Sequence, residues 1–303
     1  MGMTLRHRIR QDQRMCPAHR NNDVARDPNG ADDPASPVRR PTTARDGAGA
    51  TPAHGTPPAD GTASTAARVA ALLSAFRPGD EALGVSELAR RTGVPKSTTH
   101  RLTAHLADEG LLEPAGRGRL RLALKLFEIG QLAVAQRGLV DAARPYLADL
   151  REATRNTAHL AVLEGTEVVY LDILRGPDAP TLPSRVGGRF PAHATSVGKA
   201  ILAFSAESVV DDVITAGLSR ISPRTVTAPG LFRSQLATIA RDSIAYDREE
   251  SGVGVVCAGA PLLGSDGTAV GALSLSGWTN RMRLDRVAPA VRTAALTLSR
   301  LLP

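Results

Sequence analysis

The sequence predicts an α+β protein whose first folded part is a winged helix-turn-helix. Two short helical patterns meet at a turn that contains Gly93, and the second pattern opens with Pro95 followed by hydroxyl residues. A hairpin pattern studded with arginine follows at residues 111–122. Farther along the chain, β-branched runs and helical patterns mix without regular alternation, which favours an α+β fold over a doubly wound sheet.

Composition and charge favour a soluble protein of more than one domain that binds a polyanion. The 303 residues leave room for about two domains. The net charge is +7, and residues 61–122 are its densest part, with nine basic and six acidic residues. All nine basic residues except Lys96 are arginines, which suit bidentate contacts with phosphate or guanine. DNA is therefore the leading candidate partner.

The cysteines and the apolar runs bear on the cellular compartment. Cys16 and Cys257 are too few for a disulfide framework, which fits a reducing cytoplasm. No apolar run approaches the roughly 20 residues that cross a bilayer, and the arginine-rich N-terminus lacks the apolar stretch of a secretory signal. We expect a cytoplasmic protein with no membrane partner.

Residues 1–63 differ from the rest of the chain. Pro, Gly, Ala, Thr, Asp and Arg alternate there without periodicity, and large apolar residues are nearly absent. We predict a disordered tail rich in Pro, Gly, Ala and Arg. This tail either has no specific role, assists DNA binding weakly through its arginines, or reflects a start site assigned too early.

Two helices are predicted before the turn at Gly93. The first begins near residue 64 and is stopped by residues 78–80, and its apolar residues recur at helical spacing. Those apolar residues are Val69, Leu72, Leu73 and Phe76. The second helix starts at Ser86, whose hydroxyl is expected to cap it. It carries Glu87 in its first turn, turns Leu88 inward and ends at Gly93.

The helix predicted over residues 95–109 has two faces. The packing face consists of Thr99, Leu102, Thr103 and Leu106, and the opposite face of Ser97, Arg101, Ala104 and Asp108. The polar face can enter a major groove, where Ser97 and Arg101 are the candidates for reading bases. Lys96 and Thr98 lie in the first turn, where free N–H groups and the helix dipole favour phosphate. The alternative is an ordinary amphipathic helix with a solvated polar face.

Residues 111–122 predict the wing, two short strands around a glycine-rich turn. Arg119 and Arg121 alternate with leucines, so we expect the arginines on one face and the leucines on the core face. Arg117 at the tip is the leading candidate for a groove contact. The full set of predicted DNA contacts is Lys96, Ser97, Thr98, His100, Arg101, Arg117, Arg119 and Arg121. The winged helix-turn-helix domain is then expected over residues 64–122.

The C-terminal half is predicted to mix strands with helices. Strands are predicted over residues 168–173, 253–263 and 268–276, with a turn at 264–267, and helices over 197–204, 207–216, 231–242 and 286–302. Between the two halves, residues 123–138 predict a linker helix, with breaks at Gly130 and Gly138.

Motifs along most of the chain follow the pattern of one known family. The N-terminal motifs are Phe76, SELA (86–89), TGVPKSTTHRL (92–102) and LRL (120–122). The C-terminal motifs, in order, are HLAVL (159–163), VVYLD (168–172), HATSVGKA (193–200), YDREE (246–250), GVVCAGAP (254–261) and ALSLSG (272–277). In these motifs the chain resembles the IclR-type transcriptional regulators over about residues 64–303.

The resemblance implies a GAF-like effector-binding domain over residues 139–303, a curved antiparallel sheet flanked by helices. This domain would bind a small molecule, a small organic or aromatic acid, and thereby adjust the affinity for operator DNA. The resemblance also implies a homodimer that packs through the linker helices, with a dimer of dimers known in the family, and an inverted-repeat operator. The protein would repress or activate transcription, depending on where the operator lies. No cofactor, metal or catalytic residue is implied.

The same resemblance, carried over residue by residue, nominates an effector pocket. Its members are Thr195, Ser196, Val197, Asp247, Glu249, Cys257, Ser274 and Ser276. Free N–H groups at the start of the helix near residue 197 favour a carboxylate, and Ser274 and Ser276 share one face because they lie two apart on a strand. The alternative is that the hydroxyl residues are only helix caps and the cysteine a small buried apolar residue.

Two other classes of function stay open as alternatives. Cys257, His159 and His193 are residue types of a thiol–imidazole or metal site, but no paired-histidine, C-x-x-C or phosphate-loop spacing supports an enzyme. A ligand-binding module without DNA binding is disfavoured because the recognition helix and the wing are both intact. Salt dependence separates these classes, since specific DNA binding weakens steeply as salt rises.

Overall fold

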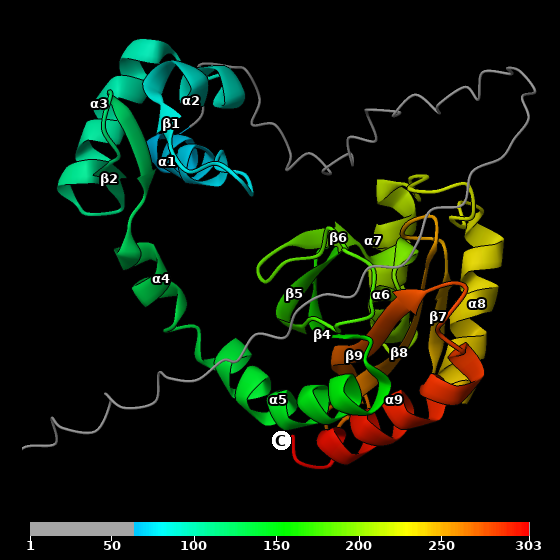
Figure 1. Cartoon of the computed structure of the whole chain (residues 1–303). Helices are drawn as coiled ribbons and strands as arrows, with labels where there is room; N and C mark the ends of the chain where they lie inside the picture. Colours follow the sequence, from blue (N-terminus) through cyan, green and yellow to red (C-terminus); the bar gives the residue numbers. More distant parts are fainter. Residues whose placement is uncertain (1–63, 303) are drawn as a thin grey trace, which may run out of the picture. The chain divides into compact units, whose positions relative to one another are not determined.

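The computed structural model describes residues 64–302, without the side chains of residues 134–136 (Figure 1). The tail predicted for residues 1–63 lies outside the described residues. Within the described range, no helix has both the length and the apolar character needed to cross a bilayer.

The N-terminal part is built from α1 (Thr65–Ser74), α2 (Val85–Thr92) and α3 (Lys96–Asp108) with a small antiparallel sheet. The sheet has the order β1-β3-β2, formed by β1 (Leu83–Gly84), β2 (Leu112–Pro114) and β3 (Arg119–Leu122). Its core is the buried cluster Leu72, Ala75, Leu83, Leu88 and Leu102. These elements are a helix-turn-helix followed by a wing, as the sequence predicts.

Local details of this part differ from the sequence expectations. Ser86 does not cap α2, which begins one residue earlier at Val85, with Gly84 in the N-cap position. The reason is that β1, which the helical pattern does not reveal, leads directly into the helix. Pro95 is the N-cap of α3 rather than its first residue. Gly93 ends α2 in the left-handed conformation, φ 70°, as expected.

The wing departs from the expected division into a polar and an apolar face. Leu122 is 43% exposed, so the expectation that the leucines of β3 share a buried face is wrong for this residue. It lies opposite Leu112, which is 1% exposed, but it is not part of the buried cluster of this domain. The turn between the strands holds Gly116, Arg117 and Gly118 at positive φ.

The predicted linker helix is two helices. The first, α4 (Leu124–Gly130), ends at the first predicted break, and α5 (Val134–Thr154) then runs through Gly138 without interruption. The break expected at Gly138 is therefore wrong. Because Ala143, Leu147 and Leu150 of α5 are packed in a core, that packing outweighs the roughly 1 kcal/mol that a glycine costs a helix.

The C-terminal part is built on a six-stranded antiparallel sheet of order β6-β5-β4-β9-β8-β7. Its strands are β4 (Thr157–Glu164), β5 (Glu167–Leu174), β6 (Arg189–Pro191), β7 (Ala245–Arg248), β8 (Val255–Leu263) and β9 (Ala269–Trp278). The three predicted strands are confirmed as β5, β8 and β9. At the centre of the sheet, β4 lies beside β9, so that His159 is opposite Ser274.

Helices cover both faces of this sheet (Figure 1). One face packs against α5 and α9 (Leu284–Ser299), and the other against α6 (Ser196–Leu202), α7 (Glu207–Ala216) and α8 (Pro229–Asp242). The predicted helices are all present with bounds shifted by a few residues. The fold is the predicted α+β arrangement, a helix-turn-helix part followed by an antiparallel sheet with flanking helices.

Candidate functional site: a candidate nucleic-acid interface and a cavity

The predicted DNA-facing side of α3 is open to solvent. Lys96, Ser97, His100 and Arg101 are exposed, and Thr98 is half-buried. On the other side, Thr99, Leu102, Thr103 and Leu106 are buried, which confirms the predicted packing face. The buried side of α3 fixes the helix against the rest of the domain, and its exposed side forms one polar face. Contact of that face with DNA stays a prediction.

Hydroxyl groups fix the turn that presents α3. The Thr92 hydroxyl donates to the carbonyl of Leu88 at 2.8 Å and accepts from the amide of Val94 at 3.3 Å. The Thr99 hydroxyl lies 3.2 Å from the carbonyl oxygens of both Val94 and Pro95. These contacts close the connection between α2 and α3, so the direction of α3 is set by the rest of the domain.

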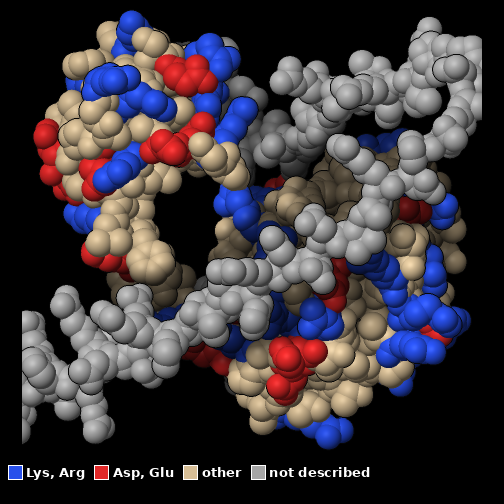
Figure 2. Space-filling view, in the orientation of Figure 1, with Lys and Arg blue, Asp and Glu red and all other residues tan. Residues whose placement is uncertain are grey.

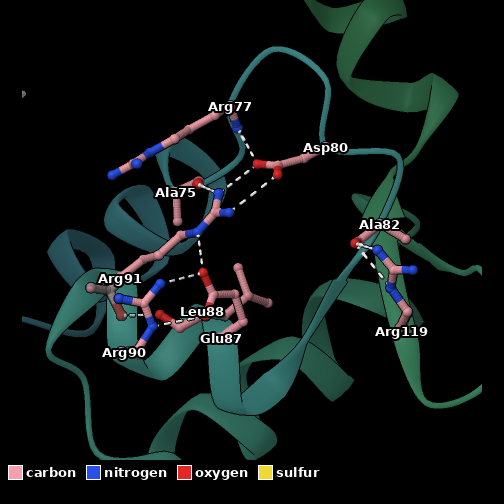
Figure 3. A network of polar contacts seen from close by, with 10 residues as sticks. Ala75, Arg77, Asp80, Ala82, Glu87, Leu88, Arg90, Arg91 and Arg119 are labelled. Atoms are coloured by element: carbon pink, nitrogen blue, oxygen red, sulfur yellow. Dashed lines mark hydrogen bonds and ion pairs between the residues drawn. The ribbon is translucent and has the colours of Figure 1, made fainter. Parts of the chain in front are cut away.

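A polar network centred on Arg91 ties α2 to the segment that follows α1 (Figure 3). The Arg91 guanidinium donates to the carbonyl of Ala75 at 3.0 Å, to Asp80 at 2.5 Å and to Glu87 at 2.7 Å. Hydrogen bonds from Arg90 and Arg91 lower the pKa of Glu87 to about 2. The hydrogen bond from Arg91 lowers the pKa of Asp80. The sequence pattern gave no sign of this role for Arg91, since arginine at this position also suits a solvated helix face.

The three predicted wing arginines differ in what they contact. Arg119 donates from its guanidinium to the carbonyl of Ala82 (Figure 3). Arg121 forms an ion pair with Glu113 at 2.5 Å across the hairpin. Arg117 is exposed at the tip of the turn and has no hydrogen-bond or ion-pair partner within residues 64–302. Of the three, only Arg117 is free to reach a nucleic acid without breaking a contact of the protein.

The surface around these residues combines both signs of charge and is hollowed beside the recognition helix. Figure 2 shows Lys and Arg side chains interspersed with Asp and Glu over the helix-turn-helix part. A groove of ≈ 270 Å³ lies between α3 and the wing, and its lining includes His100, Ala104, Pro114 and Gly118. The groove thus separates the exposed face of α3 from the strands of the wing.

A cavity of ≈ 240 Å³ lies in the C-terminal part on one face of the sheet. Its lining includes seven of the eight predicted pocket residues, Thr195, Ser196, Val197, Asp247, Cys257, Ser274 and Ser276. Strand alternation explains the grouping. Leu273 and Leu275 of β9 belong to the core under α5 and α9, so Ser274 and Ser276 lie on the opposite face.

Glu249, the eighth predicted residue, does not line the cavity. Its carboxylate pairs with Arg224 at 3.0 Å and accepts from the amide of Gly254 at 2.8 Å. Its backbone is left-handed, with φ 66°. These contacts hold Glu249 in the loop after β7, outside the cavity.

A chain of hydrogen-bonding groups crosses the cavity wall from one strand to the next. The Ser184 hydroxyl lies 3.2 Å from Nε2 of His159, whose Nδ1 lies 3.5 Å from the Ser276 hydroxyl. That hydroxyl lies 3.0 Å from Sγ of Cys257, which lies 3.5 Å from Asp247. The register explains the order, since Ser276 is opposite Cys257 and Cys257 is opposite Asp247.

Burial controls the protonation of the groups in this hydrogen-bonded row. It lowers the pKa of His159 to about 3, with the charge of Arg175 adding to the effect, so the imidazole is neutral at neutral pH. Burial also raises the pKa of the Cys257 thiol and of the Asp247 carboxyl. Both pKa shifts favour the neutral thiol and the neutral imidazole over a thiolate–imidazolium pair.

The third residue of the enzyme alternative lies elsewhere. His193 hydrogen-bonds the carbonyl of Ser219 at 2.9 Å and meets the ring of Phe232 edge-on at 6.4 Å. Within the described part of the chain, no group of three or more His, Cys, Asp or Glu residues is placed to hold a metal ion. Cys257, His159 and His193 therefore do not form one site.

A buried ion pair joins α6 to the loop after β7, and both of these segments contribute residues to the cavity lining. Nζ of Lys199 on α6 lies 2.5 Å from Glu250, and the two side chains are 1% and 6% exposed. The amide of Glu250 donates to Asp247 at 2.7 Å, and its carbonyl accepts from the Thr225 hydroxyl at 2.7 Å. The pair links the helix that begins at the cavity to the loop that closes it.

Close backbone packing explains the glycine at residue 259. A Cβ added to Gly259 of β8 would lie 2.9 Å from the carbonyl carbon of Ser196. Only glycine lets α6 approach the sheet this closely. The first turn of α6 is therefore held directly against the strand that carries Cys257.

Several lining residues were not predicted. They are His159, Tyr170, Thr181, Leu182, Pro183, Ser184, Phe190 and Val255. His159 was considered only for a thiol–imidazole site. Its position at the start of the strand motif HLAVL, where it shares a strand face with Ala161, was the signal available in the sequence. The loop residues carried no periodic signal at all.

Comparison with known families covers both parts of the chain. The family model described as "Bacterial transcriptional regulator IclR C-terminal" matches residues 131–300, and "IclR helix-turn-helix domain" matches residues 65–116. The HTH-type transcriptional regulator XynR of Escherichia coli (strain K12) is 30% identical over 240 residues, 78% of this chain and 95% of its own length. The transcriptional repressor IclR of the same organism is 29% identical over 243 residues, 79% and 89% of the two chains.

Solved structures of similar proteins share the fold. An IclR homolog from Microbacterium hydrocarbonoxydans, complexed with 4-hydroxybenzoate, has 30% sequence identity and a TM-score of 0.73, covering 78% of this chain and 98% of its own. The Thermotoga maritima IclR has 26% identity and a TM-score of 0.65, with the same coverage of 78% and 98%. Both the helix-turn-helix part and the part with the cavity therefore match proteins of one kind.

Proposed function

This chain belongs to the IclR family of bacterial transcriptional regulators, and from its own residues we propose how it binds DNA, a second copy and an effector. It is a DNA-binding transcriptional regulator. We assign DNA binding to residues 64–122 and effector binding to the part that begins with α5. The regulator would act in the cytoplasm, and the position of its operator would decide between repression and activation.

The observation that carries the proposed DNA contact is the exposed polar face of α3. Ser97 and Arg101 would read base edges in the major groove, and Lys96, Thr98 and His100 would contact the backbone near the start of the helix. Arg117 would extend the contact from the tip of the wing. Arg119 and Arg121 stay in the proposed contact set, and their contacts with Ala82 and Glu113 also hold the wing in position.

The proposed homodimer rests on apolar side chains around α4. Leu124, Phe127, Ile129 and Leu132 are between 50% and 73% exposed. A run of large apolar residues at this exposure marks an interaction surface rather than a solvated linker. A second copy of the same helix is the partner that would cover it, and two-fold symmetry then predicts an inverted-repeat operator.

The proposed effector site is the cavity of ≈ 240 Å³. The first amides of a helix have no partner within the helix, so the start of α6 at Ser196 and Val197 can receive a carboxylate. The hydroxyls of Ser274 and Ser276 can receive a second polar group on the facing strand. Because a similar structure holds 4-hydroxybenzoate, we propose a small hydroxylated acid as the effector class and 4-hydroxybenzoate as the first probe.

We propose a binding function without catalysis. The relatives are transcriptional regulators, and burial keeps the thiol of Cys257 protonated and the imidazole of His159 neutral. A buried thiol in this state is an inert wall of a binding site rather than a nucleophile. No cofactor or metal enters the proposed mechanism.

A gel shift on the DNA upstream of the coding region tests the DNA contact. We expect a complex that resists unrelated competitor DNA and weakens steeply between low and high salt. The variant Arg101→Ala should lose about 1–3 kcal/mol of binding, whereas Arg90→Ala, an exposed arginine on α2, should keep the wild-type affinity. Equal affinities of the two variants would refute the assigned face.

A thermal-unfolding series with 4-hydroxybenzoate tests the effector site. Binding to the folded state alone stabilises it by about 2.7 kcal/mol at a ligand concentration 100 times the dissociation constant. A ligand-dependent rise of the midpoint would support the proposed class. An unchanged midpoint with 4-hydroxybenzoate and with related hydroxy acids would refute it while leaving the DNA contact in place.

A further inference from the structure

The segment between β5 and β6 reaches from α5 to the cavity. We call residues 175–184 of this segment the strap. Its far end, Thr181 to Ser184, lines the cavity, and its near end follows directly after Leu174, the last residue of β5. The strap is not part of the sheet, so its position depends on the contacts that hold it at either end.

At the near end, the strap is bonded to the last turn of α5. Nε of Arg151 donates to the carbonyl of Arg175 at 2.9 Å. Nε of Arg155, the residue that ends α5, pairs with Asp178 at 2.5 Å. The C-terminal end of α5 therefore contacts the strap twice. Arg151 bonds to its backbone, and Arg155 bonds to one of its side chains.

Backbone packing reinforces this end. The amide of Gly176 donates to the Thr157 hydroxyl at 3.1 Å, at the start of β4. A Cβ added to Gly176 would lie 2.3 Å from the carbonyl oxygen of Arg155, so this position requires glycine. The near end of the strap thus lies directly on the connection between α5 and β4.

At the far end, Arg175 holds the residues that close the cavity. Its guanidinium donates to the carbonyl of Leu182 at 3.4 Å and to the carbonyl of Ser184. The Ser184 hydroxyl in turn lies 3.2 Å from Nε2 of His159 in the cavity wall. Arg175 is consequently bonded on both sides, through its carbonyl to α5 and through its guanidinium to the cavity.

We propose that the strap couples the effector cavity to α5, with Arg175 as the residue that positions it and Arg151 as its anchor on the helix. A ligand that bonds to His159 competes with Ser184 for the same nitrogen, and a ligand that fills the cavity contacts the far end of the strap directly. Either one moves the far end of the strap. The hydrogen bonds of Arg175 and Arg151 carry that displacement to α5. Because α5 continues along the chain into α4 and the DNA-binding domain, the helix is the element through which both sites are connected. This inference rests on the proposed effector and DNA functions.

The thiol of Cys257 offers a probe of cavity closure that needs no known effector. Cys257 lines the cavity and is 7% exposed, and the only other cysteine of the chain is Cys16. In the full-length Cys16→Ser protein, the rate of modification by methyl methanethiosulfonate, followed by mass spectrometry, reports how often the cavity opens. The same protein selects its operator duplex from a random pool, and the rate is measured with and without that duplex.

Variants of exposed arginines separate the two ends of the strap. Arg175→Met should raise the labelling rate about fivefold without DNA, since it removes the bonds to two cavity carbonyls. Arg175→Lys should give an intermediate rate, because one donor is restored. Arg151→Met combined with Asp178→Asn, which also removes the ion pair with Arg155, should keep a closed cavity but lose the coupling to α5. Arg137→Met, also on α5 but paired with Asp141 and not with the strap, is the matched control.

Reciprocity makes the coupling measurable from the DNA side. If effector and operator affect each other's binding, the operator must change the effector's affinity by the same factor, at least about fivefold for a typical coupling. Under the proposal it does so through cavity opening, so we expect the labelling rate to change about fivefold or more. We expect this change in the wild type and in Arg137→Met, and its loss in the Arg151→Met, Asp178→Asn double variant. An operator effect that persists in the double variant, no operator effect in the wild type, or wild-type labelling of Arg175→Met would each overturn the proposal.

Failure of the proposed function gives different results. A protein that selects no duplex lacks the proposed DNA function, and the Arg175→Met rate then still decides whether the strap closes the cavity. If 4-hydroxybenzoate does not slow the labelling of Cys257, the proposed ligand is refuted, whereas the operator-dependent rates still decide the role of the strap.

Discussion

Replacing Lys199 with methionine should destabilise the C-terminal domain more than any exposed charge replacement in it. The substitution removes one partner of a pair that is almost fully buried, with side-chain exposures of 1% for Lys199 and 6% for Glu250. Methionine keeps the length and flexibility of the lysine side chain, so the change tests the charge rather than the packing. Among residues 64–302, the carboxylate left behind forms no other ion pair, and one of its oxygens, Oε2, already has no hydrogen-bond partner there.

The magnitude follows from the geometry of the pair. At 2.5 Å and an effective dielectric constant of about 20, the attraction is about 7 kcal/mol. Removing the two ions from water costs several kcal/mol each, so the pair as a whole contributes little net stability. Breaking it is different, because the remaining ion stays desolvated without its partner. We therefore expect Lys199→Met to lose about 3–5 kcal/mol of unfolding free energy, and Lys199→Met with Glu250→Met to recover most of that loss.

Urea unfolding followed by tryptophan fluorescence measures these free energies. Trp278 on β9 is the only tryptophan of the chain, so the signal reports the domain that holds the pair. Arg233→Met is the matched control. Arg233 of α8 forms exposed ion pairs with Glu207 and Asp211 of α7, so its loss should cost at most about 1 kcal/mol. The reasoning is refuted if Lys199→Met costs no more than the control, or if the double variant is no more stable than the single one.

Three further results are expected. Ser274→Ala combined with Ser276→Ala should leave operator binding unchanged and weaken the thermal response to 4-hydroxybenzoate, and a normal response would place the ligand elsewhere. Gly198→Ala should destabilise by about 1–3 kcal/mol or more in urea, because the added methyl group would lie 2.1 Å from a main-chain carbonyl oxygen, and wild-type stability would contradict this packing. Hydrogen bonds from Arg90 and Arg91 lower the pKa of Glu87 from 4.5 to about 2. The contribution of ionised Glu87 to stability is therefore complete above pH 4.5 and is lost as the pH falls towards 2. Glu87→Gln should reduce the pH dependence of helix loss in that window by circular dichroism, and an unchanged acid transition would show that the network does not stabilise the domain.

The helices of the DNA-binding domain could be predicted from the sequence because their signals are local. Gly93 and the period of the apolar residues define the turn and the packing face of α3 without reference to the rest of the chain. Ser86 shows the limit of this reasoning, since a serine near a helix start is a cap only if the helix begins after it. The two-residue strand β1, which moves that start to Val85, depends on pairing with β3, and sequence spacing does not reveal such a contact.

Gly138 failed as a helix break for a similar reason. A glycine weakens an isolated helix, but α5 is held by the side chains that it packs against the sheet. Whether those residues meet a partner depends on strands far away along the chain. The order of the strands could not be predicted for the same reason, because β4 pairs with β9, a strand more than a hundred residues later in the sequence.

The residues of the candidate site that lie on strands could be predicted from the sequence, whereas those in loops could not. Ser274, Ser276 and Cys257 reach one face by alternation, and their motifs gave their positions. Glu249 lies in the loop after β7, where a left-handed backbone directs its carboxylate to Arg224, and no periodic pattern marks that change. Ser184 and the rest of the strap likewise gain their place through long-range hydrogen bonds.

Selection of duplexes from a random pool by the full-length protein tests the central claim, that α3 and its symmetry mate read a specific operator. The account predicts enrichment of one inverted repeat, with half-sites about 10 base pairs apart or a multiple of that spacing, and no such enrichment by Arg101→Ala. Enrichment of no sequence by the wild type, or of the same sequence by both proteins, would contradict it.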